Sequence, residues 1–126
     1  MKELTRAELQ IMQILWKIQS GFLKEIHEQF PQPRPATTTV STMLRILVKK
    51  DFLTFDSFGK QHRYRPLVSK KAYAKARLKG FLGQFFDGSP QALLSFFAAD
   101  NDMSLKELEE MQSILQDEIQ NKKVEP

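Results

Sequence analysis

The chain of 126 residues has room for one compact domain, or for a small domain with an accessory helical segment. Its 41% hydrophobic and 27% charged content is typical of a soluble globular protein, and without cysteine it can form neither a disulfide nor a thiolate metal site. We expect a cytoplasmic protein that does not enter a membrane, because the chain has no long apolar run and its first residues lack the apolar core of a secretion signal.

The charge is divided unevenly along the chain. Residues 1 to 79 contain 16 lysines and arginines against 6 acidic residues, a net charge of +10. Residues 80 to 126 contain 3 against 9, a net charge of −6. A strongly basic part indicates a polyanionic partner, although charge alone fits a solvated surface equally well.

The first two predicted elements are helices. Thr5 and Glu8 have the spacing of a capping box, and apolar residues at helical spacing extend the first helix over about residues 6 to 18. A second, shorter helix is predicted within FLKEIHEQF, residues 22 to 30, and Pro31 lies just beyond it.

The threonine-rich stretch TTTVSTMLRILVKK at residues 37 to 50 is predicted to be a helix rather than a strand. Threonine and valine are poor helix formers, but Val40 and Leu44 share one side of a helical wheel while the hydroxyl and basic side chains gather on the other. We therefore predict a helix over residues 38 to 50, capped by Thr37.

The period then changes to that of strands. Apolar and polar residues alternate on both sides of a turn near Ser57 to Gln61, which predicts a β-hairpin that ends at Pro66. Three helices followed by a hairpin form the pattern of a winged helix-turn-helix, in which the third helix enters the major groove and the hairpin, or wing, touches the DNA backbone nearby.

This arrangement gives the hydroxyl side chains a role. Short hydroxyls let a helix approach base edges and phosphates closely, and a threonine methyl group can pack on the methyl group of thymine. A solvated helix face is the alternative interpretation. The predicted DNA-binding residues are Arg34, Thr37, Thr38, Thr39, Ser41, Thr42, Arg45, Lys49, Lys60, His62 and Arg63.

Several basic and aromatic residues also fit a structural role. Lys50, like Lys49, suits either a phosphate contact or the C-terminal turn of a helix. His27 is interpreted as a surface histidine, and Trp16 as a core residue rather than a platform for base stacking. His62 is interpreted as a wing residue rather than a metal ligand, and no metal, cofactor or catalytic set is predicted.

The rest of the chain is predicted to be helical, with helices that start near Ser69, Pro90 and Ser104. The stretch QALLSFFAA is apolar nearly all round, and the last helix has one apolar side. A second copy of the chain is favoured over the N-terminal domain as the cover for these side chains. The predicted dimer interface comprises Leu82, Phe85, Phe86, Leu93, Leu94, Phe96, Phe97, Leu105, Leu108, Met111 and Leu115.

Three stretches resemble the penicillinase repressor (BlaI/MecI/CopY) family of winged-helix transcriptional repressors. LTRAELQIMQILWK is similar to the family pattern L-T-x-A-E-x-x-I-M-x-x-L-W, TTTVSTMLRILVKKDFL to its recognition helix, and GKQHRYRPLVSKKAY to its wing. The similarity extends over about residues 4 to 75. It implies a homodimer that binds a palindromic operator in double-stranded DNA, and C-terminal helices that dimerise.

The chain also departs from the family. Antibiotic-responsive members are cleaved by a sensor protease, commonly at an Asn-Phe bond, whereas the comparable stretch here offers Ser95-Phe96. The copper-responsive members carry a cysteine cluster that this chain lacks. Asp51 stands where the family usually has glycine, and Phe22 and Leu23 replace small, polar residues.

We therefore expect a mainly α protein with a small β-hairpin wing, organised as a winged helix-turn-helix DNA-binding domain over residues 1–68 and a helical dimerisation segment over residues 69–126. The expected function is that of a dimeric, non-enzymatic repressor with a recognition helix at about residues 37–50 and a wing at about 57–65, and an unidentified sensor or protease as a further partner. The alternative is a protein-interaction module that engages a partner protein through its C-terminal helices.

Overall fold

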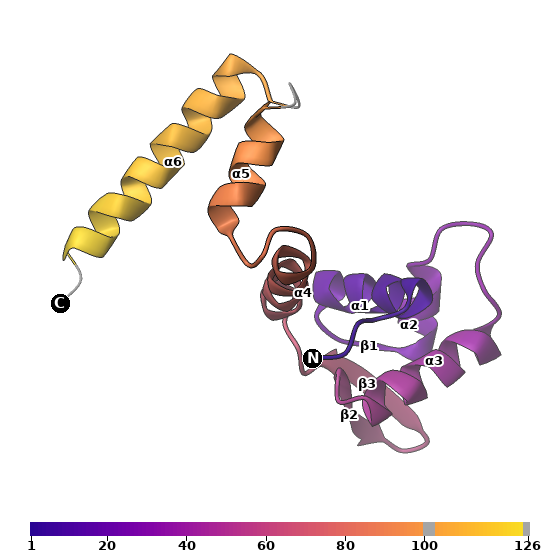
Figure 1. The fold of residues 1–126 in the computed structure, drawn as a ribbon. Helices are drawn as coiled ribbons and strands as arrows, with labels where there is room; N and C mark the ends of the chain where they lie inside the picture. The colour runs from indigo at the N-terminus through magenta and orange to yellow at the C-terminus, as the bar shows by residue number, and fades with distance from the viewer. Residues whose placement is uncertain (100–102, 125–126) are drawn as a thin grey trace. The chain divides into compact units, whose positions relative to one another are not determined.

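The computed structural model describes residues 1–99 and 103–124 (Figure 1). The elements in chain order are α1 (Arg6–Ile18), β1 (Gly21–Phe22), α2 (Leu23–Glu28), α3 (Thr37–Lys49), β2 (Leu53–Phe58), β3 (Gln61–Pro66), α4 (Lys70–Phe85), α5 (Pro90–Ala99) and α6 (Leu105–Val124). The predicted fold class is confirmed: the chain is mainly helical, and a small antiparallel sheet containing the wing follows the first three helices.

The chain divides into two compact units, Met1–Leu78 and Lys79–Pro126. The boundary between them falls inside α4, whereas the boundary expected from the sequence, after residue 68, lies just before this helix. Within residues 1–99 and 103–124, no helix is both long enough and apolar enough to cross a membrane.

α1 begins at the predicted capping box. The Thr5 N–H donates to Oε1 of Glu8 at 2.9 Å, and the Glu8 N–H donates to Oγ1 of Thr5 at 3.2 Å. Glu8 is buried, and its other carboxylate oxygen accepts a hydrogen bond from Nζ of Lys50 at 2.8 Å. Of the two roles that the sequence allowed for Lys50, this bond favours the structural one, since it ties the end of α3 to the start of α1.

The second helix is shorter than predicted at both ends, because Phe22 belongs to a strand and Gln29 and Phe30 lie beyond the last helical residue. Gly21 and Phe22 make up β1, and α2 covers only Leu23–Glu28. β1 pairs antiparallel with β3, which completes a three-stranded sheet in the order β1-β3-β2. Two residues are too few to show the alternating pattern of a strand in the sequence. β1 is therefore recognised only by its pairing with β3.

The turn between α2 and α3 is held by two side chains. His27, interpreted from the sequence as a surface residue, is half-buried, and its Nε2–H donates to the Pro35 carbonyl at 2.9 Å. Arg34 donates from Nε to the carbonyl of Phe30 at 2.9 Å and from Nη2 to the carbonyl of Glu28 at 3.0 Å. The two bonds from Arg34 satisfy carbonyl groups at and just beyond the end of α2 that the helix itself leaves free.

α3 starts at Thr37, one residue before the predicted start. The prediction that Thr37 caps it was wrong, because the N-cap position is Ala36, which makes no side-chain cap. The Val40 N–H donates to the carbonyl of Ala36 at 3.1 Å, so Thr37 already lies in the first turn. Ala36 has the extended backbone that is usual at an N-cap, with φ −61° and ψ 147°, so the helix begins one residue earlier than predicted.

α3 ends in a Schellman motif. The Phe52 N–H donates to the Leu47 carbonyl at 3.0 Å, and the Asp51 N–H donates to the Val48 carbonyl at 3.1 Å. Asp51 adopts a left-handed φ of 64°. Glycine adopts this conformation without strain. Aspartate has a β-carbon, so at this position it costs the fold some conformational strain energy.

The hairpin has the predicted form. β2 and β3 pair over six residue pairs, from Leu53 with Pro66 to Phe58 with Gln61. This register leaves Gly59 and Lys60 as a two-residue turn, and Gly59 has a φ of 63°. Lys60 is therefore presented at the tip of the wing.

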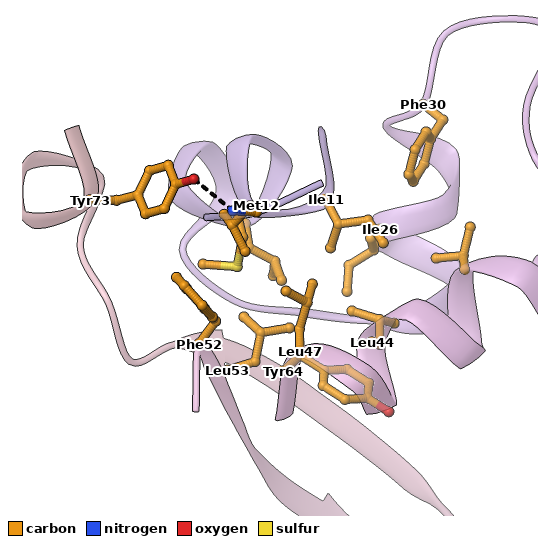
Figure 2. Close-up of a cluster of buried hydrophobic side chains, with 13 residues drawn as sticks. Ile11, Met12, Ile26, Phe30, Leu44, Leu47, Phe52, Leu53, Tyr64 and Tyr73 are labelled. Carbon is orange, nitrogen blue, oxygen red and sulfur yellow. Dashed lines mark hydrogen bonds between the residues drawn. The ribbon is translucent and has the colours of Figure 1, made fainter. Parts of the chain in front are cut away.

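The core of the first unit lies between α1, α2, α3 and the base of the hairpin (Figure 2). Tyr73 of α4 also belongs to this core, and its hydroxyl accepts a hydrogen bond from the Leu4 N–H at 2.8 Å. Trp16 is half-buried and packs against this core, which agrees with its interpretation as a core residue. Its Nε1–H donates to the Val68 carbonyl at 2.8 Å.

The predicted helix starts in the second half of the chain are confirmed. Ser69 Oγ accepts from the Ala72 N–H at 3.0 Å, and Ser89 Oγ accepts from the Ala92 N–H at 3.0 Å. At the start of α6, Ser104 and Glu107 form a capping box. The Ser104 N–H donates to Oε1 of Glu107 at 3.0 Å, and the Glu107 N–H donates to Oγ of Ser104 at 3.1 Å.

Glu8→Gln should lower the free energy of unfolding by about 1–3 kcal/mol at pH 7, because it removes a charge from a buried ion pair. Burial raises the pKa of the Glu8 carboxyl, but the hydrogen bonds from Lys50 and Thr5 outweigh this and hold the pKa below its ordinary value of 4.5. The carboxylate therefore stabilises the fold above pH 4.5, and this contribution is lost as the pH falls through the lowered pKa.

Urea unfolding of both proteins between pH 7 and pH 3 measures this effect, and the two stabilities should converge at low pH. Glu3→Gln is the matched control, since the carboxylate of Glu3 pairs with Arg77 at 3.3 Å on the surface. It should change stability by less than about 0.5 kcal/mol. A Glu8→Gln protein as stable as the parent at pH 7 would contradict the role of the pair.

Asp51→Gly should raise the free energy of unfolding by about 0.5–1 kcal/mol, because it relieves the left-handed conformation without changing the hydrogen bonds of the Schellman motif. Asp51→Ala serves as the comparison. It should lower the free energy of unfolding, since alanine is more strained than aspartate or glycine in the left-handed conformation. Chemical denaturation of the three proteins measures the difference. Equal stabilities for the glycine and alanine variants would show that the φ of this residue has no energetic consequence.

Candidate nucleic-acid interface

The burial pattern of α3 decides which of its side chains can meet a ligand. Val40, Leu44 and Leu47 are completely buried. The opposite side of the helix is exposed and carries Thr38, Thr42, Arg45 and Lys49. The predicted geometry, in which the hydroxyl and basic side chains project outward together from a helix, is confirmed.

One of these hydroxyls is already engaged. Oγ1 of Thr42 donates to the carbonyl of Thr38, one helical turn earlier, at 3.0 Å. A threonine in this arrangement can still accept a hydrogen bond, but its only O–H donor is used within the helix. This bond could not be predicted from the residue types, because it depends on the side-chain rotamer.

A groove of about 730 Å³ lies between α3, the start of α2 and the wing. It is lined by Thr37, Ser41 and Arg45 from α3, and by Lys60 and His62 from the hairpin. The fold therefore brings five of the predicted residues, from two separate segments, to a single concave surface. A basic groove beside an exposed helix can accommodate a polyanion that follows both surfaces.

Lys24 also lines this groove, and sequence reasoning missed it. It is an exposed residue of α2, and nothing in the sequence separates it from other surface lysines. The pairing of β1 with β3 carries the start of α2 to the wing. Only this pairing, between segments about 40 residues apart, could have identified Lys24.

Aromatic contacts support the wing. The imidazole of His62 is stacked on Phe55, with ring centroids 4.0 Å apart and an interplanar angle of 8°. Phe58 near the wing tip packs edge-on against Phe22 of β1, with centroids 5.8 Å apart. These contacts fix the hairpin against β1 and so hold Lys60 and His62 in place beside the groove.

Tyr64 forms part of the groove wall below Arg45. Burial raises the pKa of the Tyr64 phenol, while the positive charge of Arg45 opposes this effect. The phenol therefore stays neutral at physiological pH and does not neutralise the guanidinium group.

The remaining predicted residues lie elsewhere on the first unit. Thr39 and Arg34 line a second hollow, beside α1 and the turn before α3. Lys49 is exposed in the last turn of α3, and Arg63 is exposed on β3, opposite Asp56. The predicted set is thus a central group in and above the groove, with outlying residues on its flanks.

The predicted dimer residues belong to the second unit, and many of them are exposed. Phe85, Phe96, Phe97, Leu105 and Leu115 are exposed, and Phe86, Leu93, Leu94, Leu108 and Met111 are half-buried. Leu82 is buried. Leu105, for example, leaves 72% of its surface accessible, so much apolar surface is available for a partner.

Metal ligation finds no support in the described part of the chain. Among residues 1–99 and 103–124, no three histidine, aspartate or glutamate side chains gather as metal ligands would.

Comparison with known proteins identifies the family. The profile described as penicillinase repressor matches residues 4–117. The penicillinase repressor of Bacillus licheniformis is 26% identical over 122 residues, which cover 96% of this chain and 95% of that protein. The methicillin resistance regulatory protein MecI of Mammaliicoccus sciuri is 27% identical over 114 residues, which cover 90% of this chain and 93% of that protein.

A solved structure described as "CopR Repressor Structure" is 35% identical, with a TM-score of 0.45, and the match covers 54% of this chain and 100% of that one. The family match extends over both units of the chain, including α4, α5 and most of α6. This chain therefore belongs to the penicillinase repressor family, whose members are transcriptional repressors rather than enzymes.

Proposed function

We propose that the chain is a dimeric repressor that binds a palindromic operator, with α3 in the major groove and the wing on the adjacent backbone. The observation that carries this proposal is the exposed side of α3 above a basic groove, which joins Arg45 to Lys60 and His62. A helix that presents hydroxyl and guanidinium groups beside a cationic hairpin suits a duplex, because a helix fits the major groove and a hairpin beside it can reach the backbone.

The contacts divide into two kinds. Thr38, Ser41, Thr42 and Arg45 are placed to meet base edges, since they lie on the outward or groove side of α3. The remaining cations would meet phosphates, two of them from the groove and three from its flanks: Lys24, Lys60, Arg34, Lys49 and Arg63. Thr37, Thr39 and His62 complete the proposed surface at its edges.

The role of Arg34 is narrower than that of the other cations. Two of its N–H groups are bound to backbone carbonyls at the end of α2. Its remaining N–H groups and its charge are still available to a phosphate near the start of α3. Arg34 would then both shape the turn and contact DNA.

The second unit would bind the partner copy of the chain. Its exposed phenylalanine and leucine side chains would be covered by the same surface of another chain, as expected for a two-fold symmetric dimer. Two linked recognition helices then match the two halves of a palindrome. The net charge of −6 over residues 80–126 keeps this unit away from DNA and leaves DNA binding to the basic first unit.

The same apolar side chains also favour a second candidate function. A protein-interaction module would cover them with a different protein and would have no use for the basic groove. Sensitivity of DNA binding to salt separates the two functions.

Arg45→Ala should reduce discrimination between operator and random DNA by about 1–3 kcal/mol, because it removes a base contact. Lys60→Ala should weaken binding to both DNAs about equally and reduce the salt slope by about one, because it removes a phosphate contact. The operator is obtained by selection from random duplexes, and binding is measured from 50 to 300 mM salt.

The parent chain should bind the selected duplex in the nanomolar range and lose affinity steeply with salt. Binding that does not change with salt would favour the interaction module. Equal losses of discrimination in the two variants would refute the division between base and phosphate contacts.

Leu115→Glu should raise the dimer dissociation constant roughly tenfold or more, because it places a charge in the proposed apolar interface. Sedimentation equilibrium measures the change, and operator binding should weaken with it. Ser113→Glu is the matched control, since Ser113 is exposed on the opposite side of α6. A Leu115→Glu protein that remains as dimeric as the control would rule out this face as the interface.

A further inference from the structure

A row of β-branched side chains runs along the outward side of α3. Thr38, Thr42 and Ile46 are spaced four residues apart, so they follow one another on neighbouring turns of the helix. Ile46 leaves 40% of its surface exposed. In α3, all of whose residues the structure describes, it is the one large hydrophobic side chain that is exposed.

The residue types in this row lower the stability of the helix. Threonine and isoleucine are poorer helix formers than alanine, lysine or glutamate, any of which suits a solvated position better. Val40, Leu44 and Leu47 anchor α3 on its buried side, and Ile46 is not among its buried residues. A molecule that packs on Ile46 would remove its exposed apolar surface from water.

The internal hydrogen bond of Thr42 determines what this residue offers to that molecule. Its hydroxyl is directed at the Thr38 carbonyl, 3.0 Å away, and donates there. The methyl group on the same β-carbon is the part of this exposed side chain that remains for an apolar contact. β-branched side chains have few rotamers, so Thr42 and Ile46 lose little freedom when a ligand packs against them.

The chemistry of the major groove identifies the matching group. Base edges there present hydrogen-bond donors and acceptors, and the single apolar group among them is the methyl group of thymine. Arg45 and Lys49 flank the row on α3, and their charges suit the guanine edges and phosphates beside such a base.

We propose that Thr42 and Ile46 are specificity-determining residues that read thymine methyl groups in each half of the operator. This rests on the proposed function, because α3 must lie in the major groove. To the proposed function it adds the identity of one selected base, thymine, and of the two side chains that recognise it, Thr42 and Ile46.

The test replaces thymine with uracil, which differs only by lacking the methyl group. A duplex selected by the full-length chain from a random pool is resynthesised with uracil at each thymine of its half-sites in turn. At one or two positions, uracil should weaken binding by the parent chain about fourfold per methyl group. Thr42→Ser and Ile46→Ala should each bind thymine and uracil duplexes equally, within twofold, at the position that the residue contacts.

Three features make the variants specific. Thr42→Ser keeps the hydroxyl that donates to Thr38 and removes only the methyl group, whereas Thr42→Val keeps the methyl group and should still distinguish thymine from uracil. Ile46→Ala improves helix propensity, so the fold is retained, as circular dichroism verifies. Lys49→Ala, on the same helix, should bind more weakly and still prefer thymine.

Two results would overturn the proposed role of the row. Either the parent chain binds uracil duplexes as tightly as thymine duplexes at every position, or both Thr42→Ser and Ile46→Ala keep the full preference for thymine. Both results leave DNA binding by α3 intact. If the chain selects no duplex at all, the proposed function itself is wrong, and the reading of thymine is wrong with it.

Discussion

The burial of Val40, Leu44 and Leu47 fixes the rotation of α3 about its own axis, and the candidate interface depends on this constraint. Because these three side chains are completely buried, Thr38, Thr42, Arg45 and Lys49 must project the other way. A turn of the helix by one residue would bury Arg45 or expose Leu44, both at a cost of several kcal/mol. The core thus sets the direction of every proposed base contact.

Both ends of α3 are held by polar contacts within the first unit. Lys50 pairs with the buried Glu8, and Arg34 and His27 bind backbone carbonyls in the preceding turn. These bonds come from α1, from α2 and from the connection between α2 and α3, so the helix is fixed along its axis as well as around it. A recognition element gains from such support, because precise placement reduces the entropy lost on binding.

The wing is held in the same manner, by stacking of His62 on Phe55 and by the contact of Phe58 with Phe22. Together with the core of α3, these contacts create a groove whose walls come from three segments of the chain. Most of the basic residues belong to this unit, and most of the acidic residues and exposed apolar side chains belong to the other. One chain therefore separates the proposed tasks of binding DNA and binding its partner copy.

The sequence by itself determined the features that depend on neighbours a few residues apart. The capping boxes, the helical period that selects the outward side of α3, and the hairpin with its turn at Gly59 and Lys60 are all encoded in such short spacings. The tertiary structure alone decided the strand β1, the partner of Lys50, 42 residues away, and the place of Lys24 in the groove. It also decided that the Thr42 hydroxyl turns inward. Local hydrogen bonding has a period that residue types reveal, whereas contacts between distant segments and the choice of a rotamer depend on how the whole chain packs.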